Sequence, residues 1–292
     1  MLIIGENLNA VAKRIGEAFK RKDPVPLRQM AEAQTEAGVD LIDINLGPAR
    51  KGGAKLMEWV VKTVQEVTDL PLSLDTTNVE AIEAGLNVCK NRPLINSISA
   101  RPERMEALLP LAKKFSAPYI ALTLGPEGIP RDANERGLLA AEHLARAAGY
   151  GIPEEDVWID PIILPINSQQ VQVQGCTEFV MMLSDIAPDS KSTCGLSNIS
   201  HGAPGHLRGI LNRAYFIMLK RYGMYSAIAD AFDKELFEIA RGKMPGLEAL
   251  VHKVMDNEPI DLPALSKEEA DYVKTARVLM GQTLYSDSWL EL

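Results

Sequence analysis

The sequence has little cysteine, no long apolar run and no concentration of basic residues. Its three cysteines, Cys89, Cys176 and Cys194, stand far apart without CxxC spacing. This spacing predicts neither a disulfide framework nor a zinc site, and it favours a reducing, cytoplasmic environment. No apolar stretch approaches the roughly 18 residues of a membrane span, and the first residues lack the basic segment of a signal peptide. A net charge of −8 disfavours nucleic acid as a partner.

What the chain does have is an ordinary globular composition, with 46% hydrophobic and 24% charged residues. Short apolar runs alternate with amphipathic stretches along its length, which is typical of βα units and a parallel sheet. Helices are expected between the strands, among them one after the N-cap candidate Asn78 and one from about 177 to 186. Eight strands are expected, at 2–5, 40–46, 72–75, 94–97, 119–124, 157–160, 193–197 and 225–229.

Eight strands with helices between them are the number that closes a (β/α)8 barrel. The sequence therefore predicts an α/β fold, a (β/α)8 TIM barrel with a C-terminal helical extension. We expect one domain over 1–292, with the barrel over about 1–245 and the extension over about 246–292. The alternative, a doubly wound open sheet, would show a GxGxxG turn after its first strand. Residues 5–9 read GENLN instead.

Polar side chains gather where the predicted strands end, which is where barrels of this type carry their active sites. Such groups suit a planar, nitrogen-rich heterocycle, because Asp accepts from adjacent N–H donors whereas Asn both donates and accepts. No lysine, arginine or histidine falls among them, which disfavours a phosphate site or a Schiff base. The strand-end residues are Glu6, Asn7, Asp43, Asn45, Asp75, Asn96, Thr123, Asp160, Ser197, Asn198 and Asp230.

Each of these residues also has a purely structural interpretation. Asp75 would cap the following helix, although Asn78 is better placed to do so. Asp160 precedes a proline and suits a turn, and Asn96 inside an apolar run could make a structural hydrogen bond. His201 and His206 are a possible metal pair, but no third ligand is in view and we interpret them as loop residues. Because all of these strand-end residues are expected on one rim of the barrel, we interpret them together as a binding site.

Seven segments at these strand ends resemble one known family when taken together and in order. They read IIGE at 3–6, DINLGP at 43–48, LDTTN at 74–78, INS at 95–97, IDPIILP at 159–165, GLSNIS at 195–200 and AIAD at 227–230. This series resembles the pterin-binding TIM barrels, and specifically the methyltetrahydrofolate:corrinoid protein methyltransferases of anaerobic one-carbon metabolism. The resemblance covers essentially the whole chain.

The resemblance implies a role for each matching residue. Asp75, Asn96 and Asp160 would hydrogen-bond the pterin edge, and Asn198 would reach N5, which carries the methyl group. The remaining substrate-binding residues implied are Gly195, Ser197 and, as a looser match for the glutamate tail, Arg208. The stretch 201–209 departs from the pattern of acetogenic members, which bears on tail contacts and partner docking.

The reaction implied is methyl transfer between N5 of tetrahydrofolate and the cobalt of a corrinoid, with its direction open. An amine leaves poorly unless N5 receives a proton or a strong hydrogen bond. Asn198 is the expected catalytic residue, acting by hydrogen bonding in the transition state, and solvent is the only other donor expected at the rim. The chain lacks the DxHxxG cobalamin signature, so the cobalamin would come on a separate corrinoid protein. The resemblance also implies a homodimer, with the tail after Asp233 as a candidate interface.

Three alternatives remain open at this point. A dihydropteroate synthase would share the fold, but it would need a basic motif near the last strand, where the sequence reads Ala229-Asp230. A metal-dependent barrel lyase or hydrolase would use the same aspartates with His201 or His206. A folate-binding or corrinoid-docking protein without catalysis would need only the pocket.

Overall fold

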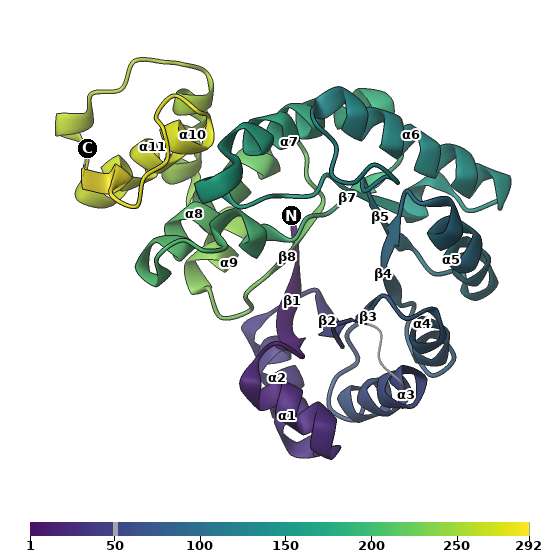
Figure 1. The fold of residues 1–292 in the computed structure, drawn as a ribbon. Coiled ribbons are helices and arrows are strands. Elements are labelled where there is room, and N and C mark those ends of the chain that lie inside the picture. The colour runs from purple at the N-terminus through teal and green to yellow at the C-terminus, as the bar shows by residue number, and fades with distance from the viewer. Residues whose placement is uncertain (49–51, 292) are drawn as a thin grey trace.

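The computed structural model describes residues 1–48 and 52–291. Its strands form one parallel sheet in the order β7-β6-β5-β4-β3-β2-β1-β8, with helices packed around the outside (Figure 1). The strands are β1 (Leu2–Asn9), β2 (Leu41–Asn45), β3 (Leu72–Asp75), β4 (Leu94–Ser99), β5 (Tyr119–Leu122), β6 (Val157–Asp160), β7 (Lys191–Ser192) and β8 (Ser226–Ala229).

The sheet closes between its last two strands. Ile228 donates its backbone N–H to the Cys194 carbonyl at 2.8 Å, and Gly195 pairs with Ile228 as an isolated parallel bridge. The Ser226 hydroxyl donates to the Ser192 carbonyl at 3.2 Å. These contacts join both edges of the sheet and confirm the predicted (β/α)8 barrel.

The seventh strand differs from the prediction of 193–197. Only Lys191–Ser192 is regular strand, and the chain then turns into a 3-10 helix, η2 (Leu196–Ser200). The turn begins where the Asn198 N–H donates to the Gly195 carbonyl at 3.2 Å. The apolar residues Cys194 and Leu196 look like strand in the sequence, and both are fully buried, but Leu196 already belongs to η2.

The outer helices follow the strands, and Asn78 caps α4 as predicted, its Oδ1 accepting the Ala81 N–H at 3.0 Å. Two expectations were wrong: α1 was not predicted, and α7 begins at Ile166 rather than near 177. Both stretches consist mostly of polar residues, and only a few apolar side chains on one face of each helix are buried, so the helical pattern is weak in the sequence. The helices are α1 (Lys13–Arg21), α2 (Pro24–Ala37), α3 (Gly53–Val64), α4 (Val79–Leu86), α5 (Pro102–Phe115), α6 (Ala133–Gly149), α7 (Ile166–Ile186), α8 (Gly205–Arg221) and α9 (Lys234–Ala240).

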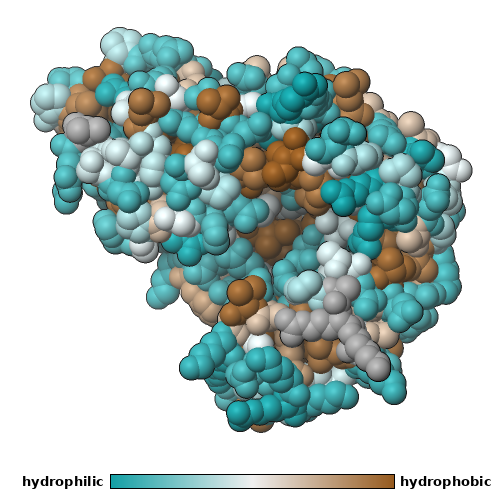
Figure 2. All heavy atoms as spheres, viewed as in Figure 1, coloured by the Kyte–Doolittle hydropathy of each residue, from teal (hydrophilic) through white to brown (hydrophobic). Residues whose placement is uncertain are grey.

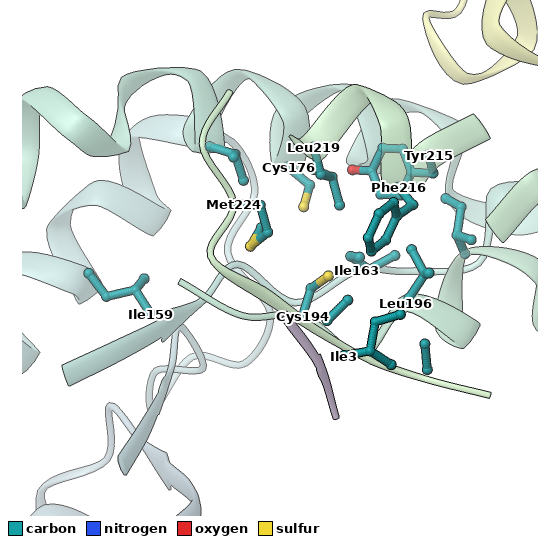
Figure 3. Packing of buried hydrophobic residues seen from close by; sticks show 14 of the residues in the cluster. Ile3, Ile159, Ile163, Cys176, Cys194, Leu196, Tyr215, Phe216, Leu219 and Met224 are labelled. Carbon is teal, nitrogen blue, oxygen red and sulfur yellow. The ribbon is translucent and has the colours of Figure 1, made fainter. Parts of the chain in front are cut away.

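The core has two layers because strand side chains alternate between the barrel axis and the helices. The larger layer lies between sheet and helices, and Figure 3 shows part of it, where Cys176, Cys194, Tyr215 and Phe216 lie close together. Both of these thiols are free and fully buried. A separate small cluster fills the barrel interior, comprising Ile4, Leu41, Leu94, Ile120 and Trp158.

The C-terminal extension consists of α10 (Pro245–Met255), α11 (Lys267–Leu279) and a tail with a short 3-10 helix. It lies outside α8 (Figure 1), and α11 also contacts α7. The Gln170 side chain on α7 holds the tail, since its Nε2 donates to the Thr283 carbonyl at 2.7 Å. Trp289 is buried and donates from Nε1 to Thr275 Oγ1 at 3.0 Å. Over the described residues, no helix is both long and apolar enough to cross a membrane.

Candidate functional site

Carboxylates and amides of three neighbouring strands meet at one end of the barrel. The Ser73 hydroxyl donates to Asp43 Oδ1 at 2.6 Å, and Asn96 Nδ2 donates to the same atom at 3.0 Å. Asn45 Nδ2 donates to Asp75 Oδ2, and Asp75 pairs with Asn96 in the strand register. The structure thus brings Asp75 and Asn96 together, as expected from the sequence, and adds Asp43 and Asn45 to the cluster.

Strand geometry explains why these residues share the cluster. Asp43 and Asn45 are two positions apart on β2, so both face the barrel axis while Ile42 and Ile44 face the helices. Burial raises the pKa of Asp43, and burial together with the negative charge of Asp43 raises the pKa of Asp75 well above its usual range. Two neighbouring carboxyls, Asp43 buried and Asp75 half-buried, disfavour double ionisation, so the cluster can hold a proton and can donate as well as accept.

Asp160 ends β6 and serves both as a turn residue and as a buried carboxyl facing the site. Its Oδ1 accepts the Ile162 N–H at 2.8 Å, which is the turn role that the sequence suggested. No described residue donates a hydrogen bond to its second oxygen. Burial raises the pKa of Asp160 to about 7, and the Ile162 N–H opposes part of that rise. One oxygen is therefore fixed by the backbone and the other is available to a ligand.

A second polar group joins β1 to the turn η2. The Ser197 hydroxyl donates to Glu6 Oε1 at 2.7 Å. Asn198 follows Ser197 and is exposed at the mouth, whereas Asn96 and Asp160 are buried and Asp75 is half-buried. A Cβ on Gly195 would lie 2.9 Å from Asn198 Nδ2, so the glycine leaves room for the Asn198 amide.

Arg208 lies on α8 beside this group and is exposed. Its Nε donates to the Ser200 hydroxyl at 3.2 Å, and its positive charge acts on Glu6. The structure therefore places a cation near the mouth, although the strand-end residues themselves include none. This position is compatible with the predicted contact to a substrate tail.

Glu6 is the functional candidate whose properties the sequence did not reveal. Burial raises its pKa to about 7, and the Ser197 hydrogen bond offsets part of that rise. Asn198 and solvent were the only donors expected at the rim, and Glu6 and Asp160, whose pKa values burial raises to about 7, are two further candidates. The position of Glu6 was visible in the sequence, but β1 was expected to end at Gly5, whereas it runs on to Asn9 and holds Glu6 half-buried inside the strand.

Other polar residues of the rim have structural partners. Asn7 Nδ2 donates to Asp230 Oδ1 at 2.9 Å and Asn7 Oδ1 accepts the Ala231 N–H at 2.9 Å, which fastens β1 to the end of β8. His201 and His206 are exposed. Within 1–48 and 52–291, no three His, Cys, Asp or Glu side chains are placed to hold a metal ion.

The surface around the site is concave. The face seen in Figure 2 is hollowed near its centre, over the strands of Figure 1. A separate cavity of about 530 Å³ is lined by residues at the start of α7, in the turn after η2 and in the C-terminal tail, including Asn167, His201 and Tyr285. Asp75, Asn96 and Asp160 do not line it, so this cavity adjoins the turn that carries Asn198 rather than the buried carboxyls.

A closed parallel barrel with polar groups at the carboxyl ends of its strands defines a (β/α)8 protein with a ligand site at its mouth. The family model of pterin binding enzymes matches residues 5–228, and the chain belongs to that family. The ligand contacts expected of Asp75, Asn96, Asp160 and Asn198 stay predictions.

Two named relatives share most of the matched region. The chain is 29% identical over 238 residues to a methylcorrinoid:tetrahydrofolate methyltransferase of Eubacterium limosum, covering 81% of this chain and 87% of that protein. It is 29% identical over 242 residues to the methionine synthase of Mycobacterium tuberculosis, covering 79% of this chain and 20% of that protein. The chain thus spans about a fifth of the methionine synthase.

Solved structures show the same fold at lower identity. A dihydropteroate synthase of Yersinia pestis in complex with a sulfonamide drug has a TM-score of 0.62 and 17% identity, covering 84% of this chain and 94% of that one. A dihydropteroate synthetase with a product has a TM-score of 0.64 and 19% identity, covering 83% and 93%. These likenesses support the barrel fold.

Proposed function

We propose that this protein is a methyltransferase that moves a methyl group between N5 of tetrahydrofolate and the cobalt of a corrinoid carried by a separate protein. The observation that carries the proposal is the match to the methylcorrinoid:tetrahydrofolate methyltransferase over most of both chains. The methionine synthase of Mycobacterium tuberculosis is a second relative over a similar share of this chain. The same residues serve transfer in either direction.

Asp75, Asn96 and Asp160 are proposed to hold the pterin edge. The Asp160 oxygen to which no described residue donates suits an N–H of the ring, and Asn96 keeps its amide oxygen available while its nitrogen is bonded to Asp43. Burial raises the pKa of both Asp75 and Asp160, so N–H groups of a bound ring would stabilise carboxylates that water reaches poorly. The site is thus built for a ligand with adjacent donors and acceptors.

Asn198 is proposed as the catalytic residue that faces N5. Gly195 leaves room for its amide, Ser197 ties its turn to Glu6, and Arg208 is proposed to contact the substrate tail. When the methyl group leaves N5, the electron pair of the N–C bond stays on nitrogen, which needs a proton or a hydrogen bond. Asn198 can donate that hydrogen bond. Glu6 lies close to it, because the Glu6 carboxylate accepts a hydrogen bond from Ser197, the residue that precedes Asn198. The cobalamin on the partner supplies the nucleophile or the methyl group, according to direction.

A methyl-transfer assay tests the proposal in both directions. The purified protein is mixed with methyltetrahydrofolate and cob(I)alamin, or with tetrahydrofolate and methylcobalamin, and the corrinoid absorbance is followed. We expect enzyme-dependent transfer in at least one direction. Binding of tetrahydrofolate without transfer would instead identify a non-catalytic folate-binding protein. Formation of dihydropteroate from a pterin pyrophosphate and p-aminobenzoate would support the synthase alternative.

The oligomeric state and the compartment of the protein are also inferred here. We propose a homodimer in the cytoplasm of a cell with anaerobic one-carbon metabolism, because three free thiols suit a reducing compartment and cobalt(I) is readily oxidised. Val171 and Met181 expose 76% and 51% of their side chains on α7, which supports a partner surface there. Light scattering measures the oligomeric state.

We propose one domain, with the barrel over about 1–245 and the extension over about 246–292.

A further inference from the structure

Arg136 is a fully buried arginine on the outer helix α6. Its Nε donates to the Pro161 carbonyl at 2.8 Å, and its Nη1 donates to the Asp132 carbonyl at 3.1 Å. Its Nη2 donates to Gln172 Oε1 at 2.9 Å. These three acceptors are neutral, and burying a cation on neutral acceptors is expensive. Stability therefore does not explain this arrangement, whereas holding a backbone group in place does.

The carbonyl that Arg136 holds belongs to the peptide group between Pro161 and Ile162. The N–H of that same planar group donates to Asp160 Oδ1 at 2.8 Å. Ile162 has a φ of +61°, a left-handed conformation that β-branched residues rarely adopt. Rotating the peptide group would relieve Ile162, but it would break both hydrogen bonds at once. Arg136 and Asp160 thus hold one peptide plane from opposite ends.

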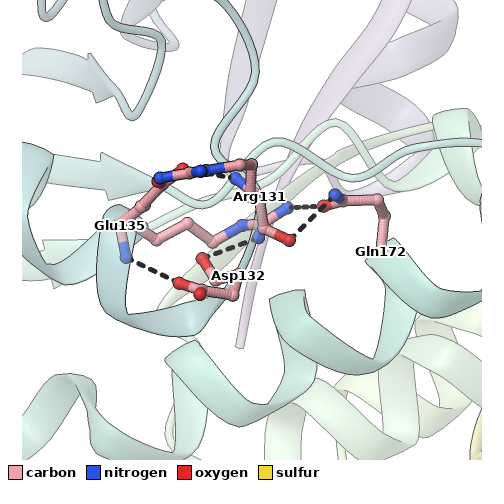
Figure 4. A network of polar contacts seen from close by, with 5 residues as sticks. Arg131, Asp132, Glu135 and Gln172 are labelled. Carbon is pink, nitrogen blue, oxygen red and sulfur yellow. Dashed lines mark hydrogen bonds and ion pairs between the residues drawn. The ribbon is translucent and has the colours of Figure 1, made fainter.

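The guanidinium is itself held from two sides. Gln172 on α7 also donates from Nε2 to the Arg131 carbonyl at 3.0 Å, and Asp132 caps α6 by accepting the Glu135 N–H at 2.9 Å. Figure 4 shows Arg131, Asp132, Glu135 and Gln172 drawn together by these contacts. The amino end of α6 and the side of α7 therefore fix where Arg136 points.

We propose that Arg136 is a positioning residue that locks the Pro161–Ile162 peptide and so orients the Asp160 carboxyl toward the substrate. The inference rests on the proposed function of Asp160 in holding the folate ring. Without Arg136 the peptide can rotate and turn the Pro161 carbonyl oxygen, instead of the Ile162 N–H, toward Asp160. Two oxygens facing each other would move the carboxyl and oppose its ionisation.

The test compares Arg136→Met and Arg136→Lys with Arg146→Met, a matched control at an exposed position of the same helix. Tetrahydrofolate affinity is measured by calorimetry from pH 6 to pH 9. We expect Arg136→Met to bind at least about tenfold more weakly, since small misplacements of site groups are costly, and the pH midpoint of binding to move upward. The affinity of Arg136→Lys should fall between those of wild type and Arg136→Met. A further variant, Arg136→Ala, should bind as weakly as Arg136→Met, and guanidinium at low millimolar concentration should restore part of its affinity. The control should match wild type.

Hydrogen exchange of the Ile162 amide gives a readout that needs no folate. Arg136→Met should lose protection at Ile162 while Arg146→Met keeps it. A folded Arg136→Met with wild-type affinity, pH midpoint and Ile162 protection overturns the inference. If Arg136→Met does not fold, Arg136→Lys and Gln172→Ala are judged by the same two measurements. If wild type binds no folate, the proposed function fails, and amide exchange alone decides whether Arg136 locks the peptide.

Discussion

Glu6 Oε1 and the Ser197 hydroxyl are joined by a hydrogen bond of 2.7 Å across the barrel mouth, between residues 191 positions apart. Glu6 belongs to β1, and Ser197 directly precedes Asn198 in η2. The bond therefore ties the half-buried Glu6 carboxyl to the turn that carries the proposed catalytic amide. Because burial raises the pKa of Glu6 to about 7, this pair can take up or release a proton near neutral pH.

The raised pKa of Glu6 predicts that the protein loses stability as pH rises. The folded-state pKa is about 7 against an ordinary value of 4.5, so between these values the native state binds more protons than the unfolded state. The unfolding free energy therefore falls between about pH 5 and pH 8, by on the order of 3 kcal/mol at most for this group. Glu6→Gln should remove this part of the slope and be more stable than wild type at pH 8.

Urea unfolding at several pH values measures the effect. The control is Glu127→Gln, which changes an exposed glutamate of the loop after β5 and should leave the wild-type slope intact. Parallel pH profiles for wild type and Glu6→Gln would show that Glu6 titrates normally in the folded protein.

The same carboxyl predicts a pH dependence of the reaction. If protonated Glu6 supports departure of the amine from methyltetrahydrofolate, the rate of methyl loss should fall above about pH 7 as Glu6 ionises. Glu6→Gln should lower the maximal rate by about a hundredfold and abolish this alkaline decline. Stopped-flow absorbance of cob(I)alamin gives the rate. A decline that persists unchanged in Glu6→Gln would assign it to another group, with Asp160 the next to test.

Asn198→Ala is expected to lower turnover more than folate affinity. The amide would act on N5 as the methyl group moves, so its loss should cost about a hundredfold in rate, while the pterin edge stays bound by Asp75, Asn96 and Asp160. Turnover comes from the corrinoid assay and affinity from calorimetry. Asn134→Ala, at an exposed position on α6, is the control. Unchanged turnover in Asn198→Ala would remove this residue from the mechanism.

The sequence predicted those parts of the molecule that depend on local pattern. Strands β3 and β6 begin and end at the predicted residues because each is a short apolar run that stops at an aspartate. The pairing of Asp75 with Asn96 follows from parallel register between neighbouring strands. The error at β7 came from Cys194 and Leu196, which are apolar like strand residues although the chain turns at Gly195.

What the sequence could not show depends on contacts between distant residues. The pKa of Glu6 depends on burial and on Ser197, and no local pattern reports either. Arg136 lies on an outer helix, where an arginine is ordinarily solvated, so its burial against Pro161 and Gln172 was not foreseen. Nor does composition distinguish a glycine that shapes a turn from one such as Gly195, which makes room for a particular side chain.

Trp289 tests whether the C-terminal extension unfolds together with the barrel. Its side chain is 1% exposed and bonds Thr275 through Nε1, so Trp289→Ala should cost about 3–5 kcal/mol. Because α11 packs on α7 and α8, we expect one cooperative transition at a lower temperature. The unfolding curves of Trp289→Ala from circular dichroism and from the fluorescence of Trp59 and Trp158 should have the same midpoint temperature. Trp289→Phe should lose less unfolding free energy than Trp289→Ala. A separate transition at a lower temperature would mean that the extension unfolds as an independent unit.

Gly195→Ala isolates the contact between that turn and Asn198. Gly195 has a φ of −78°, which alanine adopts freely, so backbone strain does not enter. Its Cβ would lie 2.9 Å from Asn198 Nδ2, and the amide must move. Turnover should therefore fall toward that of Asn198→Ala, with folding and folate affinity largely kept.

A double-mutant cycle shows whether the loss arises through Asn198. Once Asn198 is alanine there is no amide for the new Cβ to displace, so the double variant should be no slower than Asn198→Ala alone. Gly246→Ala, where an added Cβ meets no atom within 4 Å, controls for the glycine replacement itself. If the turnover losses of the two single variants add in the double variant, Gly195 acts on the substrate directly. The turn would then not act by positioning Asn198.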